Sequence, residues 1–190
     1  MSKAISNKNV ADAKFAPAPF DGPFKAALGR PELKGSWLIF GKSGSGKTTF
    51  ALQLAKYLTR FVDKVAFDSL EQGLSLSMQK AWKRVDMAAA GSKVIFLDKE
   101  SLPELRDRLS KRKSPNVIII DSVICLVGMR LADYQKLMND YPNKLFIFLA
   151  HEDDRGNPSP ALAEKIRKLS DIKMHVEGYK VFTTTRYEDR

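Results

Sequence analysis

The sequence of 190 residues contains one cysteine, Cys125, and no apolar run long enough to span a membrane. A single cysteine excludes an internal disulfide, so nothing ties the fold to an oxidising compartment. The longest apolar runs, such as residues 145–150, are far shorter than the roughly 20 residues of a transmembrane helix. The first 20 residues also lack the apolar centre of a signal peptide. We therefore expect a cytoplasmic protein that is not bound to a membrane.

Negative charge is also in short supply. The chain has 32 lysine and arginine residues against 22 aspartate and glutamate residues, which gives a formal net charge of +10. This excess favours an anionic partner, of which nucleic acid is the most common, because a bound nucleotide would neutralise only a few of the charges. The basic residues are spread along the chain rather than gathered in one tract, so a surface of solvated lysines is the alternative.

What the sequence does contain is the alternating pattern of an α/β domain. Its start is rich in alanine, lysine, asparagine and proline without periodicity, so we expect residues 1–25 to form a flexible arm and residues 26–190 one domain. From residue 36 onward, short apolar runs alternate with amphipathic stretches, which is typical of a mainly parallel sheet flanked by helices. The expected strands are residues 36–40, 64–67, 93–97, 116–120 and 144–150; the expected helices are residues 46–60, 73–85, 101–113, 131–140 and 161–170; a hairpin of residues 172–176 and 179–185, turning at Glu177 and Gly178, closes the chain.

The segment with the clearest chemistry is GKSGSGKT, residues 41–48. It matches the pattern G-x-x-x-x-G-K-[S/T] and lies between an apolar strand and an amphipathic helix, as a phosphate-binding loop requires; this context disfavours a chance glycine-rich turn. Glycines let backbone N–H groups turn toward phosphates, and the helix N-terminus adds positive potential. We expect Lys47 to reach the β- and γ-phosphates of ATP and the Thr48 hydroxyl to ligate Mg²⁺. The predicted nucleotide-binding residues are Gly41, Lys42, Ser43, Gly44, Ser45, Gly46, Lys47, Thr48 and Thr49.

Acidic residues near the ends of two expected strands could supply the remaining chemistry. Asp121 ends the strand NVIII and is placed to hold Mg²⁺ directly or through water, although a lone aspartate after a strand can also cap a helix. Ser122 could tune that acid through a hydrogen bond. Hydrolysis also needs a group that orients the attacking water. Glu71 is our candidate, because parallel strands end at the same edge of a sheet; Asp68 is the rival, and both could be solvated loop acids.

The two histidines lie on or just after expected strands. His151 closes the strand of residues 144–150 and should reach the edge that carries the glycine-rich loop. There it could contact the γ-phosphate or the attacking water, or act only as a structural hydrogen-bond donor. No partner for His175 is evident from the sequence, and we expect it to be structural.

Taken together, these features resemble the RecA-like ATPases, particularly the RadA and KaiC branch. The likeness rests on ELKGSWLIFGKSGSGKTT, followed by FDSLEQG, NVIIIDS, a strand ending in histidine and a late strand ending TTTRY, and it covers roughly residues 31–187. It implies a three-layer RecA-like P-loop NTPase fold with a central, mainly parallel sheet and a C-terminal β-hairpin. In this fold an extra strand lies between those that carry the P-loop and Asp121. The likeness also implies rings or filaments with ATP between subunits.

The resemblance implies roles for individual residues. Glu71 would be the general base, and His151 the sensor of the γ-phosphate. Arg186 would be the basic residue that reaches the γ-phosphate of a neighbouring subunit, although Thr184 stands where that branch has a lysine. The residues that align loosely with the DNA-contacting loop of the family and its basic helix are Arg155, Lys165, Arg167 and Lys168.

We therefore predict a Mg²⁺-dependent ATPase, a minimal RecA-like core that couples hydrolysis to DNA recombination, repair or replication. Single-stranded DNA is the favoured partner, and a homo-oligomer is expected. One alternative is a small-molecule kinase, for which HEDDRGNPSP with Arg155 is the only lid candidate. Another is a non-catalytic module whose docking is switched by ATP. A GTPase is disfavoured, because Ser-Val-Ile rather than x-x-Gly follows Asp121 and no aspartate lies two positions after Asn143-Lys144.

Overall fold

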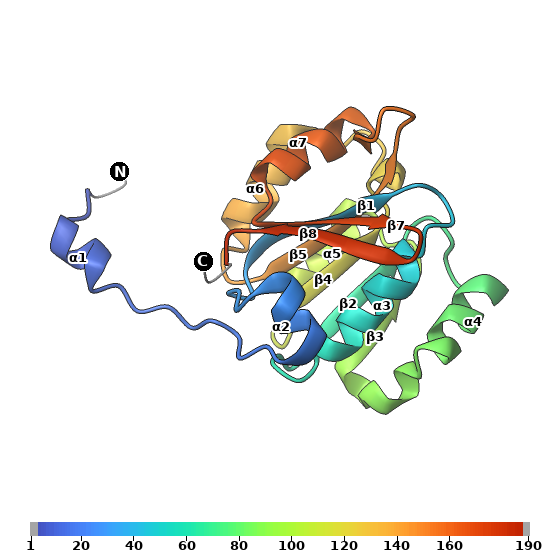
Figure 1. The fold of residues 1–190 in the computed structure, drawn as a ribbon, viewed down its shortest axis with the longest axis horizontal. Coiled ribbons are helices and arrows are strands. Elements are labelled where there is room, and N and C mark those ends of the chain that lie inside the picture. The colour runs from blue at the N-terminus through green and yellow to red at the C-terminus, as the bar shows by residue number, and fades with distance from the viewer. Residues whose placement is uncertain (1–3, 188–190) are drawn as a thin grey trace.

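One mainly parallel sheet forms the middle layer of the domain (Figure 1). The computed structural model describes residues 4–187. Its strands lie in the order β3-β2-β4-β5-β1-β7-β8, and the short β6 pairs with β5. Neighbours along this order are parallel except β7 and β8, while β6 is antiparallel to β5. The strands are β1 (Gly35–Gly41), β2 (Val65–Ser69), β3 (Val94–Leu97), β4 (Val117–Asp121), β5 (Leu145–Glu152), β6 (Pro158–Ser159), β7 (Ile172–Glu177) and β8 (Lys180–Thr185).

Helices cover both faces of the sheet, which gives three layers (Figure 1). Alternate residues of a strand point to opposite faces, so Trp37 and Ile39 of β1 belong to the core layer on the side of α2, α3 and α4, whereas Leu38 and Phe40 belong to the layer on the side of α5, α6 and α7. The predicted three-layer architecture is thereby confirmed. The helices are α1 (Asn7–Ala11), α2 (Gly22–Leu28), α3 (Lys47–Leu58), α4 (Leu76–Arg84), α5 (Leu102–Ser110), α6 (Leu131–Asp140) and α7 (Ala161–Leu169), with 3₁₀ turns η1 (Met87–Lys93) and η2 (Val123–Cys125).

Local sequence signals explain where two of these helices begin. The Ser75 hydroxyl accepts the N–H of Met78, so α4 starts three residues later than predicted. At α5, Ser101 and Glu104 form a capping box, as the sequence indicated, but the helix ends at residue 110 rather than 113. Such shifts of a few residues at helix ends are common, because the end of a helix depends on its cap.

The closing hairpin is confirmed, but its turn is one residue later than predicted. Glu177 pairs with Lys180, so the central residues are Gly178 and Tyr179 rather than Glu177 and Gly178. Both central residues have positive φ, 53° and 61°, as a two-residue hairpin turn of type I′ requires. A tyrosine is unusual at such a position. The hairpin β7–β8 lies beside β1 at the edge of the sheet (Figure 1).

The segment expected to be a flexible arm has two parts. Residues 4–14, including α1, extend away from the domain (Figure 1) and bury no side chain, whereas the Phe15 ring lies under the ammonium group of Lys34. From residue 18 onward the chain packs on the sheet side that carries α3, where Ala18 and Phe20 are buried. Phe20 lies edge-on to Tyr57, and the Asp21 carboxylate forms two hydrogen bonds with Arg60. The packed body therefore begins inside the segment 1–25.

The sheet order decides which strand ends meet. β5 lies between β1 and β4, so one strand separates the P-loop strand from the strand that ends in Asp121, as the resemblance implied. The carboxyl ends of β1, β2, β4 and β5 meet at one edge, because these strands are parallel neighbours. Among the helices of residues 4–187, none combines the length and the apolar character needed to cross a membrane.

Candidate active site

The glycine-rich loop connects β1 directly to α3 at the edge where the strands end. Gly46 caps α3 with φ at 101°, a left-handed conformation that a side chain rarely adopts. A Cβ atom at Gly41 would collide with the carbonyl oxygen of Val176, so only glycine lets β7 pack this closely against the start of the loop. These two glycines are therefore required by the fold, Gly41 by the packing of β7 and Gly46 by the start of α3, before any ligand is considered.

Lys47 folds back across this loop. Its ammonium group donates to the carbonyl oxygens of Gly41, at 2.9 Å, and Lys42, at 2.8 Å. The residue is 7% exposed, and burial lowers the pKa of Lys47, while the negative charges of Asp121 and Glu71 act in the opposite direction. The hydrogen bonds of the buried Lys47 ammonium group go to carbonyl oxygens. An anionic ligand would therefore be a stronger partner for its charge.

Thr48 and Asp121 form the candidate metal site. The Thr48 hydroxyl donates to Oδ2 of Asp121 at 2.9 Å, which joins α3 to the end of β4. Burial raises the pKa of Asp121 to about 6, against the effect of this hydrogen bond. Two oxygen donors suit Mg²⁺, which in phosphate sites uses one or two carboxylates and completes its coordination with phosphate and water. The side chains fit the predicted ion, and the buried, unpartnered Ser45 hydroxyl in the same loop is a further polar atom that a ligand could engage.

Glu71 lies beside Asp121 and contacts two other residues of the site. Its backbone N–H donates to the Asp121 carbonyl at 2.9 Å. Its carboxylate Oε2 accepts the Ser122 hydroxyl at 2.9 Å and lies 2.9 Å from Nε2 of His151. Burial acts to raise the pKa of Glu71, but the hydrogen bonds with His151 and Ser122 outweigh burial and lower it. Ser122 thus interacts with Glu71 and not, as we expected, with Asp121.

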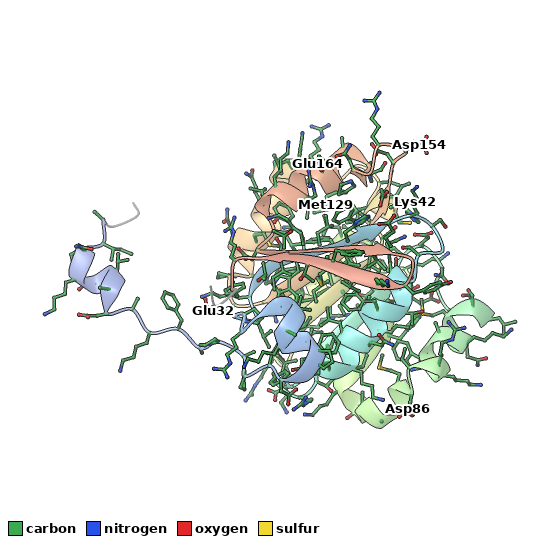
Figure 2. All side chains as sticks on the ribbon, in the orientation of Figure 1. Glu32, Lys42, Asp86, Met129, Asp154 and Glu164 are labelled. Atoms are coloured by element: carbon green, nitrogen blue, oxygen red, sulfur yellow. The ribbon has the colours of Figure 1, made fainter. Side chains whose placement is uncertain are left out.

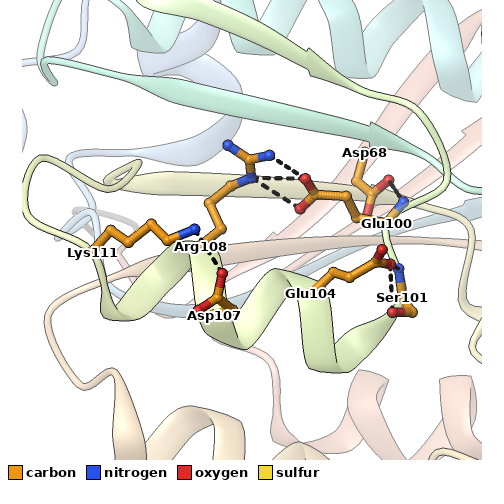
Figure 3. A network of polar contacts seen from close by, with 7 residues as sticks. All are labelled: Asp68, Glu100, Ser101, Glu104, Asp107, Arg108 and Lys111. Carbon is orange, nitrogen blue, oxygen red and sulfur yellow. Dashed lines mark hydrogen bonds and ion pairs between the residues drawn. The ribbon is translucent and has the colours of Figure 1, made fainter.

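Asp68 lies away from this site, on the opposite face of β2. Its Oδ1 accepts the N–H of Glu100 at 3.2 Å, and the Glu100 carboxylate in turn forms a bidentate pair with Arg108 of α5 (Figure 3). Burial raises the pKa of Asp68 to about 7. Asp68 lies within β2 and contacts the segment that leads into α5, whereas Glu71 lies in the turn after β2, where its backbone bonds to Asp121 at the end of β4. This placement disfavours Asp68 as the rival for positioning water.

One cavity of about 250 Å³ collects the predicted groups. It is lined by the loop from residue 43 to residue 49, Ser45 excepted, and by Glu71, Asp121 and His151. Three further residues line it that the sequence did not single out: Gln72, Arg84 from the last turn of α4, and Tyr179 from the tip of the hairpin. Gln72 follows Glu71 in the segment FDSLEQG, whereas no sequence motif marks Arg84 or Tyr179, because only the tertiary fold brings α4 and the hairpin to the loop.

The sequence indicated no partner for His175, but in the structure its side chain contacts Glu152. Its Nε2 lies 2.6 Å from Oε2 of Glu152, the residue after His151 on β5, and its ring stacks on Phe40 with centroids 4.8 Å apart. Since β1 lies between β5 and β7, this contact links the two strands that flank the start of the P-loop. The expected structural role of His175 is consistent with these contacts.

Arg186 lies at the other edge of the sheet. Its guanidinium group is 3.0 Å from the Asp171 carboxylate. The backbone N–H of Asp171 in turn donates to the carbonyl oxygen of Ser36, near the start of β1. The P-loop begins at the opposite end of that strand, about 16 Å away at roughly 3.3 Å per residue. The structure therefore does not bring Arg186 to the active site of its own chain.

The predicted DNA-contacting residues lie on one side of the domain. Arg155 is exposed in the loop between β5 and β6, which the Asp153 carboxylate holds through the N–H groups of residues 155 and 157. Lys165 is exposed on α7. Figure 2 shows Asp154 of the loop and Glu164 of α7 on the same side of the molecule. On α7, Glu164 pairs with Arg167 at 2.7 Å and approaches Lys168 at 3.7 Å, so part of the positive charge is neutralised.

The loop, the hydrogen bond between Thr48 and Asp121 and the strand order are those of a P-loop ATPase with a RecA-like fold. The chain belongs to the ATPase family associated with various cellular activities (AAA), whose family model matches residues 37–177. It is also 31% identical, over 102 residues, to the DNA repair and recombination protein RadB of Methanosphaera stadtmanae. This match includes 50% of the chain and 44% of RadB, so the chain spans less than half of the length of that relative.

Two solved structures show the same fold. The flagellar accessory protein FlaH from Methanocaldococcus jannaschii superposes with a TM-score of 0.61 and 16% identity, over 87% of this chain and 84% of FlaH. The second structure, described as an ATPase domain, superposes with a TM-score of 0.57 and 18% identity, over 85% of this chain and 84% of that domain. At these identities the likeness establishes the fold only. The predicted RecA-like fold is confirmed.

Proposed function

We propose that this chain hydrolyses ATP in the presence of Mg²⁺ and couples hydrolysis to DNA recombination, repair or replication. The observation that carries the proposal is the set of side chains around the cavity of about 250 Å³: Lys47, Thr48, Asp121 and Glu71 converge there from separate parts of the fold. A cation, a hydroxyl and two acids at the end of a P-loop are the groups that phosphoryl transfer to water requires.

The loop residues and Lys47 would bind the phosphates. Lys47 now donates to carbonyl oxygens at 2.8 and 2.9 Å, and exchanging them for phosphate oxygens would pair its charge with an anion. Thr48 and Asp121 would hold Mg²⁺. When bound there, the ion supplies positive charge that offsets the charge of the phosphates.

Glu71 and His151 would have the two remaining roles, activation of the attacking water and detection of the γ-phosphate. His151 would donate to the γ-phosphate as its sensor, and Glu71 would accept a proton from the attacking water. In this structure the two side chains hydrogen-bond to each other, which lowers the pKa of Glu71 and weakens it as a base. A phosphate that draws His151 away would remove that effect, so base strength would rise when ATP is in place.

The proposed link to DNA rests on the positive charge of the chain and on its similarity to RadB. The formal charge is +10, and Arg155 and Lys165 are exposed on the side of the domain formed by α7 and the preceding loop. RadB is described as a DNA repair and recombination protein. We favour single-stranded DNA as the partner. We further propose a cytoplasmic homo-oligomer in which Arg186 serves the site of a neighbour, since it lies far from its own.

One observation favours a second candidate, a module in which ATP binding alone drives docking. The hydrogen bonds from His151 and Ser122 hold Glu71 in a weakly basic form. If no ligand relieves these contacts, ATP would bind and persist. The rate of turnover at saturating ATP separates the two candidates.

The test is the ATPase rate of the full chain with Mg²⁺, with and without single-stranded DNA, at low and moderate salt. We expect Mg²⁺-dependent turnover that DNA stimulates, and DNA binding that weakens as salt rises. Lys47→Ala is the control and should abolish tight nucleotide binding. Turnover without stimulation and without salt-sensitive binding would remove DNA from the proposal, while absence of turnover with retained ATP binding would favour the switched module.

A further inference from the structure

The segments that lead into the four central strands lie at the edge of the sheet opposite to the P-loop. They connect α2 to β1 (residues 29–34), α3 to β2 (residues 59–64), α5 to β4 (residues 111–116) and α6 to β5 (residues 141–144). Because these strands are parallel neighbours, the four segments lie at the same edge, which we call the amino edge.

Hydrogen bonds join three of the four segments. The backbone N–H of Asn116 donates to the carbonyl oxygen of Lys64 at 2.9 Å. The Lys144 ammonium group donates to the Ser114 hydroxyl at 2.9 Å and to the Pro115 carbonyl at 2.6 Å. The amino edge is therefore one connected surface rather than a set of separate loops.

Positive charge is concentrated at the amino edge. Its four segments contain eight lysine and arginine residues and two acidic residues, whereas the segments that follow the same strands (residues 42–46, 70–75, 122–130 and 153–157) contain three of each. The amino edge thus contributes a net +6 to the formal charge of +10, and the segments beside the P-loop contribute none. The anionic partner that the net charge indicates is therefore expected at the amino edge.

Several of these cations are available to a partner. Arg30, Arg112 and Lys113 are exposed, and none of them forms an ion pair with a carboxylate among the residues that the structure describes. Arg112 and Lys113 are adjacent in the loop after α5. Two neighbouring cations without acidic partners suit the closely spaced phosphates of a nucleic acid strand.

Aromatic rings accompany the cations in a groove of about 610 Å³ at this edge. Lys34, Arg60 and Phe61 line the groove, together with residues 16–19. The Arg60 guanidinium lies 5.4 Å from the centroid of the Phe61 ring. Beside the groove, the Phe15 ring is 67% exposed and lies 5.7 Å from the Lys34 ammonium group. Cations interleaved with aromatic rings are the arrangement that contacts both the phosphates and the bases of a single strand.

We propose that the amino edge binds a single-stranded nucleic acid, with its phosphates on the basic segments and its bases stacked on Phe15 and Phe61. Figure 2 shows Glu32, which lines the groove, and Lys42 of the P-loop on opposite sides of the molecule, so ATP in the loop would leave this surface open. The inference goes beyond the proposed DNA contact on the α7 side and gives the chain a second surface for a strand. It rests on charge and on the groove, not on hydrolysis.

The test is the binding of fluorescent oligo(dT) and oligo(U) to the full chain without nucleotide, measured by anisotropy at several salt concentrations. Binding of either one supports the proposal, and the comparison distinguishes DNA from RNA. Each phosphate contact contributes about 0.7 to the salt slope, which corresponds to roughly fivefold in affinity at about 0.1 M salt. The double change Arg112→Ala and Lys113→Ala should therefore weaken binding by roughly 25-fold and make the slope less steep by about 1.4.

Phe15→Ala tests the aromatic part. Loss of one stacking partner weakens binding by roughly five- to hundredfold, but stacking releases no counterions, so the salt slope should stay the same. Val10→Ala is the matched control, because Val10 is another exposed apolar residue of the N-terminal segment and does not line the groove. It should change neither quantity. Unchanged affinity in Phe15→Ala would remove that ring from the proposal.

The control for charge is the double change Lys80→Ala and Lys83→Ala, which removes two exposed cations from α4, outside the amino edge. It should affect binding little. Equal losses in the two double variants would overturn the inference, because net charge alone would then explain the binding. Complete loss of binding after the changes Arg155→Ala and Lys165→Ala would also overturn it and would leave the α7 side as the contact. Displacement of the oligonucleotide by polyglutamate at equal charge would indicate an acidic protein as the partner instead of a nucleic acid.

The ATPase rate without DNA separates this inference from the proposed function. Arg112 and Lys113 lie at the other end of the strands from the P-loop, so their double variant should hydrolyse ATP as the wild type does. A wild-type chain that binds oligonucleotides through the amino edge but does not turn over ATP would refute the proposed hydrolysis and support the inference. A chain that hydrolyses ATP and binds oligonucleotides equally well with and without the two cations would do the reverse.

Discussion

The carboxylate of Glu71 lies 2.9 Å from Nε2 of His151, so the proposed base and the proposed sensor contact each other across the end of β4. The same oxygen, Oε2, also accepts the hydroxyl of Ser122 at 2.9 Å. One carboxylate oxygen is thus held by two donors while the other remains for water. These two hydrogen bonds fix the position of the Glu71 carboxylate and lower its basicity. Its basicity would rise when a phosphate oxygen accepts the hydrogen bond of His151 instead.

Replacing Glu71 by glutamine tests this role. The amide retains the size and most hydrogen bonds of Glu71 but cannot take a proton, so we expect turnover to fall at least about a hundredfold while ATP binding is retained. The measurement is a steady-state rate together with a binding titration. Asp68→Asn is the matched control, an acid-to-amide change three residues earlier, within β2 and away from the cavity, and its turnover should match that of the wild type. A small effect of Glu71→Gln would mean that another group orients the water.

Asp68 should make stability depend on pH. Its ordinary pKa is about 4, and burial raises it to about 7 in the folded chain. Between these values the folded state keeps a proton that the unfolded state releases, so the stability that Asp68 contributes is lost as pH rises from about 4 to about 7. Asparagine can still accept the N–H of Glu100 but cannot ionise.

We therefore expect Asp68→Asn to unfold at a higher denaturant concentration than the wild type at pH 8, by a free energy on the order of a few kcal/mol. The advantage should shrink toward pH 5. Urea unfolding at both pH values measures the difference. If the two chains lose stability in parallel between pH 5 and pH 8, Asp68 does not titrate as inferred.

The P-loop and the strand-end acids could be predicted because their signals are local. The glycine spacing, the flanking strand and the apolar run before Asp121 lie within a few residues of the groups they explain. The placement of Glu71 at the same edge followed from the parallel sheet, and the structure agrees. The partner of Ser122 could not be predicted, because it depends on how β2 and β4 align and on where the turn after β2 directs its side chain.

Contacts between distant segments explain what the sequence did not reveal. Arg84 and Tyr179 reach the cavity only through the packing of α4 and the hairpin beside α3, and neither has a neighbouring motif. Phe20 looked like part of an arm because a single aromatic residue has no periodicity, yet Tyr57 and Phe61 of the α3 region provide its contacts. The hairpin turn lies one residue later than the sequence predicts, because a tyrosine at positive φ contradicts ordinary turn preferences.

Arg186 should act only between subunits. It lies at the opposite edge of the sheet from its own P-loop, and its pair with Asp171 is partly exposed, with side chains 62% and 24% accessible. We expect Arg186→Ala to lower turnover at least about tenfold, because an arginine that stabilises the transferred phosphoryl group contributes strongly to the rate. Asp171→Ala is the control, since it breaks the same ion pair but leaves the arginine in place.

Mixing variants gives the sharper form of this experiment. A subunit with Arg186→Ala keeps an intact cavity, and a subunit with Glu71→Gln keeps its arginine. Mixed assemblies should recover activity that neither variant shows alone. Additive low rates at all mixing ratios would count against an arginine shared between subunits.

The contribution of the basic residues on the α7 side to DNA binding should be measurable from the dependence of the affinity on salt concentration. Each phosphate neutralised on a single strand contributes a slope of about −0.7 to the dependence of log affinity on log salt. Arg155 and Lys165 are exposed, so the double change Arg155→Ala and Lys165→Ala should weaken DNA binding and make this slope less steep by about one to two. Arg167→Ala should have a smaller effect, because Glu164 already neutralises that side chain.

Lys83→Ala serves as the matched control for charge. Lys83 lies on α4, which covers the face of the sheet opposite to α7, and Figure 2 shows Asp86, just after α4, far from Glu164. Its loss removes one positive charge without touching the proposed surface, so the slope should not change. If Lys83→Ala and the double variant reduce affinity in proportion to the charge removed, DNA responds to net charge alone. A reduction confined to the double variant would locate the contact on the loop and α7, directly after the strand that carries His151.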